Sequence, residues 1–139
     1  MNLKVVGEES RFTAGAISRK VMVVDDDPEQ VAEVVEYLVD RGIPATGESN
    51  PETAVARVEA ERPALVLIDV NMPGIDGLRM TQLVRGLNYG GVILLVSGDL
   101  DAVYRANQVG PDVFAVLSKP IPLQALERYA RAVLARGVI

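Results

Sequence analysis

A repeated alternation of short apolar runs and helix-like segments limits the fold of this chain more than any other feature. We expect buried strands at residues 21–24, 64–68, 92–96 and 113–117, and a weaker strand at 43–47. A helical pattern follows each of these runs. Strands that alternate with helices favour a parallel sheet with helices on both faces, and right-handed crossovers then give a doubly wound α/β fold.

The expected helices begin at recognisable signals. Asp27 and Asn50 are each followed by proline and glutamate, which suit the capping residue and first turn of a helix. Further helices are expected at about residues 77–87 and 100–109, and after Ile121, where apolar residues recur on one stripe. The chain therefore reads as five strand–helix units.

Two absent residue types narrow the chemistry. The chain has no cysteine and no histidine, which excludes disulfides, zinc–thiolate sites and histidine-based catalysis. Any metal must be a hard, oxygen-ligated cation such as Mg²⁺, Mn²⁺ or Ca²⁺. With 14 basic and 19 acidic residues the net charge is −5, which disfavours direct nucleic-acid binding.

Length and hydropathy bound the organisation of the chain. Its 139 residues suit one domain, and we divide them into an N-terminal extension at 1–19 and a folded domain at 20–139. The longest apolar runs hold five residues, and the N-terminus lacks the apolar stretch of a signal peptide. We therefore expect a cytoplasmic protein that does not engage a membrane.

Chemically capable side chains gather where the predicted strands end. Asp25 and Asp26 follow the first strand, Asp69 the third, Ser97 the fourth and Lys119 the fifth. The carboxyl ends of parallel strands share one edge of the sheet, where open α/β folds bind their ligands. Singly, these residues could be helix caps, turn residues or solvated charges. Together they are harder to dismiss, because clustered acids repel one another without a cation.

These residue types support one chemistry. Asp25 and Asp26 can hold Mg²⁺, directly or through water. Asp69 can act as a nucleophile and form an aspartyl phosphate. The metal ion and Lys119 can neutralise the transferring phosphoryl group, to which Ser97 can donate a hydrogen bond. The sequence thus predicts a magnesium-dependent phosphoryl-transfer site.

Four segments together resemble the receiver domain of two-component response regulators. They are Val23-Val24-Asp25-Asp26-Asp27, Leu67 to Leu78, Val96-Ser97-Gly98 and Ser118-Lys119-Pro120. The resemblance covers about residues 20–136 and implies a flavodoxin-like fold with strand order 2-1-3-4-5. It also implies a switch in a phosphorelay, rather than an enzyme that acts on a separate substrate.

The resemblance implies roles for single residues as well. Asp69 would accept a phosphoryl group from a histidine kinase or a histidine phosphotransfer protein. Ser97 and Lys119 would contact that group, and the Lys119–Pro120 peptide bond would be cis. Mg²⁺ would be held by Asp25, Asp26, Asp69 and the backbone carbonyl of Asn71. The downstream protein partner is not identified by the sequence.

One position departs from the family pattern. Receivers usually carry Tyr or Phe three residues before the lysine, as a rotameric switch coupled to the Ser/Thr, whereas this chain has Val116. Phe114 lies two residues earlier, on the same face by strand parity. Either the strand is shifted, or signalling does not use the usual movement of an aromatic side chain.

Other functions stay open from the residues alone. A phosphotransferase or phosphatase would share the aspartyl-phosphate chemistry, but the chain has no insertion large enough for a cap domain. A receiver without phosphorylation would be a binding module, which the complete set of acids, serine and lysine disfavours. Nucleotide binding is disfavoured because no glycine-rich phosphate loop is present.

A basic cluster on the last predicted helix has two interpretations. Arg128, Arg131 and Arg136 suit a solvated face in which Glu127 pairs with Arg131, and we favour this reading. The alternative is a docking or dimer surface, together with the fifth strand. A homodimer would then form through the face between the fourth strand and the fifth helix.

Overall fold

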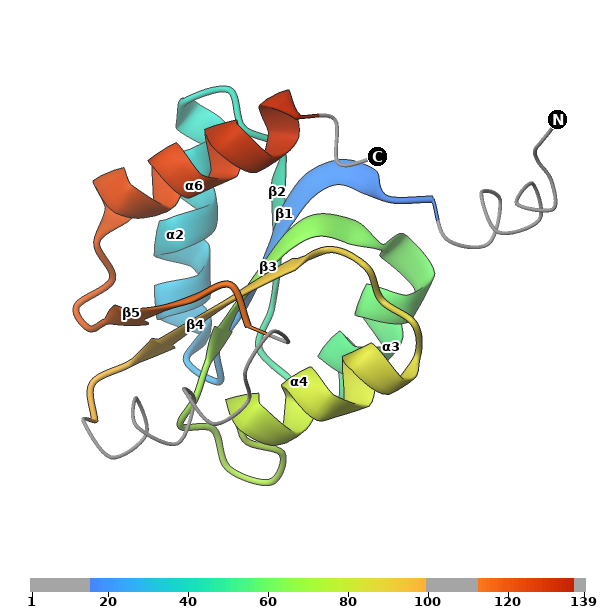
Figure 1. Ribbon diagram of the computed structural model, residues 1–139. Coiled ribbons are helices and arrows are strands. Elements are labelled where there is room, and N and C mark those ends of the chain that lie inside the picture. Colours follow the sequence, from blue (N-terminus) through green and yellow to red (C-terminus); the bar gives the residue numbers. More distant parts are fainter. Residues whose placement is uncertain (1–15, 100–112, 137–139) are drawn as a thin grey trace, which may run out of the picture.

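The structure, a computed structural model, describes residues 16–99 and 113–136 (Figure 1). The expected helix at 100–109 and residues 1–15 of the extension lie outside the described residues. The described elements are β1 (Ser18–Val24), α2 (Pro28–Asp40), β2 (Ala45–Glu48), α3 (Pro51–Glu61), β3 (Pro63–Asp69), α4 (Gly77–Gly86), β4 (Val92–Ser97), β5 (Ala115–Ser118) and α6 (Leu123–Ala135).

The strands form one parallel sheet in the order β2-β1-β3-β4-β5. Helices α2 and α6 cover one face, and α3 and α4 cover the other (Figure 1). The doubly wound α/β fold and the strand order expected from the sequence are confirmed. β1 begins at Ser18, so two residues that we assigned to the extension are part of the sheet.

Successive side chains of the central strands belong alternately to two apolar layers, one on each face of the sheet. Val21 and Val23 of β1 pack toward α2 and α6, whereas Met22 and Val24 pack toward α3 and α4. All residues of β3 are buried. The uninterrupted apolar runs in the sequence thus reflect strands covered on both faces.

The two expected helix caps are present. The side chain of Asp27 accepts hydrogen bonds from the backbone N–H groups of Glu29 and Gln30, at 3.0 and 3.4 Å. Asn50 caps α3 in the same way, and in both helices a proline follows the cap. These caps satisfy N–H groups that have no partner within the helix.

β5 differs from the prediction. It begins at Ala115, two residues later than expected. Val116 packs toward α3 and α4, whereas the ring of Phe114 contacts Tyr129 of α6 in an edge-on geometry, with centroids 5.9 Å apart. The expectation that Phe114 and Val116 share a face is therefore wrong. Phe114 precedes the strand, where the alternation of side chains does not apply.

α6 is tied to α2 by polar contacts. Arg131 pairs with Glu127 at 2.9 Å, which confirms the expected pair within the helix. Glu127 also accepts a hydrogen bond from the hydroxyl of Tyr37 in α2. Among the residues described, no helix combines the length and the apolar character needed to cross a bilayer.

Candidate functional site

The carboxyl ends of four strands bring the predicted side chains together. Asp25 directly follows β1, Asp69 is the last residue of β3, Ser97 is the last residue of β4, and Lys119 directly follows β5. The register places Asp69 beside Val96 of β4. Parallel pairing therefore assembles residues that are up to 94 positions apart in the chain (25 to 119).

Three acids form the centre of the site. Carboxylate oxygens of Asp25, Asp26 and Asp69 all lie within 4.8 Å of one another. Asp25 and Asp69 are buried, with 3% and 2% of their surface exposed, whereas Asp26 is exposed. Oxygen Oδ2 of Asp25 is buried and has no hydrogen-bond partner. An unpartnered carboxylate oxygen among other carboxylates suits a hard divalent cation.

Lys119 reaches into this cluster from the loop after β5. Its Nζ lies 3.1 Å from Oδ2 of Asp69 and 3.8 Å from Oδ2 of Asp25. Partial burial lowers the pKa of Lys119, but the hydrogen bond to Asp69 and the nearby carboxylates outweigh it and leave the pKa raised. Lys119 therefore remains a cation beside the acids.

The charge of Asp25 is disfavoured by its surroundings. Burial is the main cause that raises its pKa to about 6, and the negative charges of Asp69 and Asp26 add to the effect. The backbone N–H of Asp27, which donates to Oδ1 of Asp25 at 3.0 Å, and the cation of Lys119 act in the opposite direction. A bound cation would favour the ionised form of this carboxylate.

Asp69 is held by backbone as well as by Lys119. The N–H of Asn71 donates to Oδ1 of Asp69 at 3.2 Å, so both carboxylate oxygens have a partner. The α4 helix begins at Gly77, against the end of β3. A Cβ atom at Gly77 would lie 2.5 Å from the carbonyl oxygen of Asp69, so only glycine permits this approach. The helix expected at 77–87 begins at this residue, as the structure has it, but its close contact with β3 was not expected from the sequence.

Ser97 is buried at the edge of the site. Its Oγ accepts a hydrogen bond from the N–H of Asp99 at 3.0 Å and lies 3.3 Å from the Asp99 carbonyl oxygen, to which it donates. The N–H of Lys119 donates to the carbonyl oxygen of Ser97. The Ser97 hydroxyl is thus hydrogen-bonded within the loop that follows β4. Beside it, the bond from Lys119 links the end of β5 to β4.

The predicted site residues are brought to one edge of the sheet. The Lys119–Pro120 peptide bond is cis, as expected. The assignment of the Asn71 carbonyl as a metal ligand stays a prediction, because the contact that the structure records is made by the N–H of that residue. Chemically, the edge offers an acid cluster that could hold a cation, a buried carboxylate and a paired ammonium group.

Comparison with known proteins gives an independent view. The sequence model of the response regulator receiver domain matches residues 21–131. The DNA-binding transcriptional activator EvgA of Escherichia coli (strain K12) is 33% identical over 84 residues, which are 60% of this chain and 41% of that protein. The alkaline phosphatase synthesis transcriptional regulatory protein PhoP of Bacillus subtilis is 27% identical over 127 residues, 88% of this chain and 51% of that protein. The chain thus spans about half the length, or less, of these relatives.

Solved receiver domains have the same fold. The Francisella response regulator 1452 receiver domain superimposes with a TM-score of 0.75, at 21% identity, over 85% of this chain and 98% of that one. A CheY-like receiver domain from Methanospirillum hungatei gives a TM-score of 0.74, at 21% identity, over 84% and 94%. At this identity the likeness concerns the fold, and the family match rests on the sequence. The chain belongs to the response regulator receiver domain family of two-component systems.

Proposed function

We propose that this protein is a phosphorylation-controlled switch whose phosphoacceptor is Asp69. The observation that carries the proposal is the buried carboxylate of Asp69, held 3.1 Å from Nζ of Lys119 and beside Oδ2 of Asp25, which has no hydrogen bond. The phosphoryl donor is the phosphohistidine of a sensor kinase or of a histidine phosphotransfer protein, in keeping with the family.

The proposed reaction is a displacement at phosphorus. A carboxylate oxygen of Asp69 forms the new P–O bond while the P–N bond of the phosphohistidine breaks, and its electron pair stays on the imidazole nitrogen. Lys119 stabilises the negative charge of the transferring group. Mg²⁺, held by Asp25, Asp26 and Asp69, would supply further charge neutralisation at the phosphoryl oxygens.

Ser97 is the proposed sensor of the phosphoryl group. Its hydroxyl donates to the Asp99 carbonyl in this structure, so it must exchange that bond to donate to a phosphoryl oxygen. The exchange would alter the loop that follows β4. Because Val116 stands where receivers carry an aromatic residue, the change cannot be transmitted by a ring at that position.

The proposal also covers the setting of the switch. The protein would catalyse only its own phosphorylation, act in the cytoplasm, and signal through a protein partner without contacting nucleic acid itself. The β5–α6 face, with its arginines, would be the surface for that partner or for a second copy of the chain.

Labelling with radioactive acetyl phosphate tests the central claim. The wild-type chain should take up label in the presence of Mg²⁺, lose that ability in EDTA, and release the label in hydroxylamine, which cleaves acyl phosphates. Asp69→Asn keeps the shape of the side chain but removes the nucleophile, so it should take up none.

Asp40→Asn is the matched control, because Asp40 is an exposed acid at the end of α2. It should label at the wild-type rate. Label retained by Asp69→Asn would contradict the assignment, and rapid turnover of varied phosphoesters would indicate an enzyme instead.

A further inference from the structure

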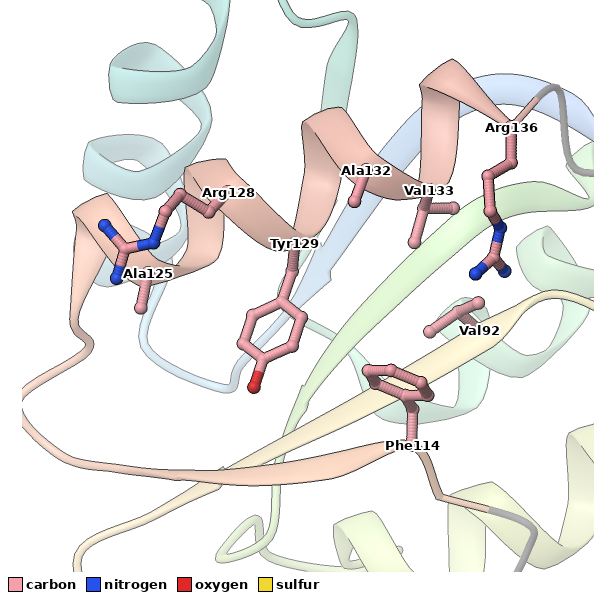
Figure 2. Close-up of a pocket in the computed structure, with 8 residues that line it drawn as sticks. All are labelled: Val92, Phe114, Ala125, Arg128, Tyr129, Ala132, Val133 and Arg136. Atoms are coloured by element: carbon pink, nitrogen blue, oxygen red, sulfur yellow. The ribbon is translucent and has the colours of Figure 1, made fainter.

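An apolar pocket of about 360 Å³ lies between α6 and the edge of the sheet at β4 and β5 (Figure 2). The residues that the sheet contributes to it lie at the opposite ends of the strands from the acid cluster, since Val92 is the first residue of β4 and Phe114 precedes β5. Its apolar walls include Val92, Phe114, Tyr129 and Val133. Arg128 and Arg136 of α6 lie toward its two ends (Figure 2).

The pocket is left uncovered by the described part of the chain. Phe114 is 61% exposed, which is the highest value for any large apolar side chain among the residues described. Within the same residues, Arg128 and Arg136 make no ion pair, whereas Arg131 of the same helix is paired with Glu127. No acidic residue lines the pocket. An apolar segment that also carries negative charge would complement this surface.

The chain itself contains such a segment. Leu3, Val5 and Val6 form a short apolar patch that also holds Lys4, and Glu8 and Glu9 follow it. These residues lie outside the described part of the structure, but they are covalently tethered to β1. Their order along the chain places the acidic pair closer to β1 than the apolar patch.

The point where the chain enters the sheet is near the pocket. Ser18 pairs with Pro63 of β3. The carbonyl oxygen of Pro63 lies 2.7 Å from the place that a Cβ atom on Gly91 would take, and Gly91 directly precedes Val92. β1 and β4 are two strands apart in the sheet, or about 10 Å. The residues from Glu9 to Ser18 can span up to about 30 Å, so the tether is long enough.

Helix α6 runs back across the sheet, so its last residues return to the edge at which the strands begin (Figure 1). Arg136 is therefore the pocket arginine that lies toward the start of β1. An acidic pair that approaches from β1 meets Arg136 first, and the preceding apolar residues then reach Phe114 and Tyr129. A tether of this length also gives the segment a high effective concentration at the pocket.

We propose that residues 3–9 of this chain dock in this pocket of the same molecule. Leu3, Val5 and Val6 pack against the apolar walls, and Glu8 and Glu9 pair with Arg136. The consequence for signalling rests on the proposed function: the docked segment covers the β5–α6 face, and a downstream partner must displace it.

Paramagnetic relaxation tests the docking directly. The chain has no cysteine, so Ser10→Cys creates a single site for a nitroxide label in the full-length protein. The amide protons of Phe114, Tyr129 and Val133 should relax faster than the amide protons of α4, which lies on the other face of the sheet. The measurement is made without a phosphodonor, so a failure of phosphorylation at Asp69 would leave it unaffected.

Charge-exchange variants show whether the contact is specific. Arg136→Glu should reduce the relaxation at the pocket to the level seen in α4, and adding Glu8→Lys and Glu9→Lys to that variant should restore it. Arg79→Glu, an exposed arginine of α4, is the matched control and should change nothing. Relaxation that persists in Arg136→Glu would overturn the proposal.

The remaining alternative is a segment supplied by a second copy. To test this alternative, chains that carry the nitroxide are mixed with ¹⁵N-enriched chains that carry no nitroxide. Docking within one molecule predicts no relaxation at the pocket of the enriched chains. Relaxation there that grows with protein concentration would assign the pocket to an interface between copies and overturn docking within one molecule.

Discussion

Asp25 and Asp26 are neighbours in the chain but differ in their surroundings. Asp25 is buried, with one oxygen held by a backbone N–H and the other without a hydrogen bond, whereas Asp26 is exposed. Burial therefore removes the carboxylate of Asp25 from water, whereas the carboxylate of Asp26 stays in contact with water. In the metal-free protein, the ionised form of Asp25 costs folding free energy that a bound cation would offset.

We predict that Asp25→Asn stabilises the metal-free protein at pH 7.5 but not near pH 4. The pKa of Asp25 is raised from 3.8 to about 6 on folding. The folded state therefore holds this proton more tightly, and stability is lost as the pH rises through 6. The gain should be at most about 3 kcal/mol. Urea unfolding in EDTA at the two pH values measures it.

Asp26→Asn is the control for this prediction. Both variants should lose the stabilisation that Mg²⁺ confers on the wild type, since both acids belong to the proposed metal site. Only Asp25→Asn should show a gain in stability that depends strongly on pH. Equal gains at both pH values would show that the burial of Asp25 is not the cause.

At the level of the elements, close backbone contacts decide how the site is positioned. The first turn of α4 lies against the end of β3, because Gly77 has no side chain to separate them. At the β2 edge of the sheet, the side chain of Arg57 in α3 donates a hydrogen bond to the carbonyl oxygen of Gly47 in β2. Arg57 also forms ion pairs with Glu48 and Glu61. The pair of Arg57 with Glu61 lies within α3, whereas the other contacts hold helices to strand ends, outside the acid cluster.

Two glycines of α4 provide a matched pair of variants. Gly77→Ala should destabilise the protein by about 1–3 kcal/mol, because its Cβ would lie 2.5 Å from the Asp69 carbonyl oxygen. Gly86→Ala meets nothing within 4 Å and should be neutral or stabilising by up to about 1 kcal/mol. Urea unfolding compares them.

The same two glycine variants should also differ in the labelling of Asp69. The backbone shift forced by Gly77→Ala begins at Asp69, so its labelling by acetyl phosphate should also slow, whereas Gly86→Ala should label normally. Equal stability of the two variants would mean that α4 moves away from β3 at little cost.

For the molecule as a whole, the two faces of the sheet carry different parts of the proposed switch. Val116 packs with the layer under α3 and α4, whereas Phe114 and Tyr129 belong to the α6 face and its pocket. A response that starts at Ser97 therefore cannot use Phe114 as a replacement for an aromatic residue at position 116.

We expect beryllofluoride, a phosphoryl mimic, to shift the amides of residues 116–118 in wild type and in Phe114→Ala alike. The contacts that drive the change are those of Ser97 and Lys119, and a two-state protein responds only to such differential contacts. NMR spectra with Mg²⁺ and beryllofluoride measure the shifts, which Asp69→Asn should lack. Shifts that vanish in Phe114→Ala would give Phe114 the switching role after all.

Local signals in the sequence determined much of this protein. Apolar runs, caps at Asp27 and Asn50, and glycine and proline positions identified the described strands and helices to within about three residues. The gathering of the candidate site residues could be predicted from the sequence because parallel strands place their carboxyl ends at one edge, so residues that follow strands meet there. Burial periodicity, capping and strand direction all act over short stretches of chain.

Contacts between distant segments were decided only by the tertiary structure. They include the burial of Asp25 beside the exposed Asp26, the pairing of Lys119 with Asp69, and the fit of Gly77 against β3. The same holds for Phe114, which parity placed on the same face as Val116 but which faces α6. Strand parity describes a residue only inside a strand, and the exact start of β5 depends on its pairing with β4 rather than on its own sequence.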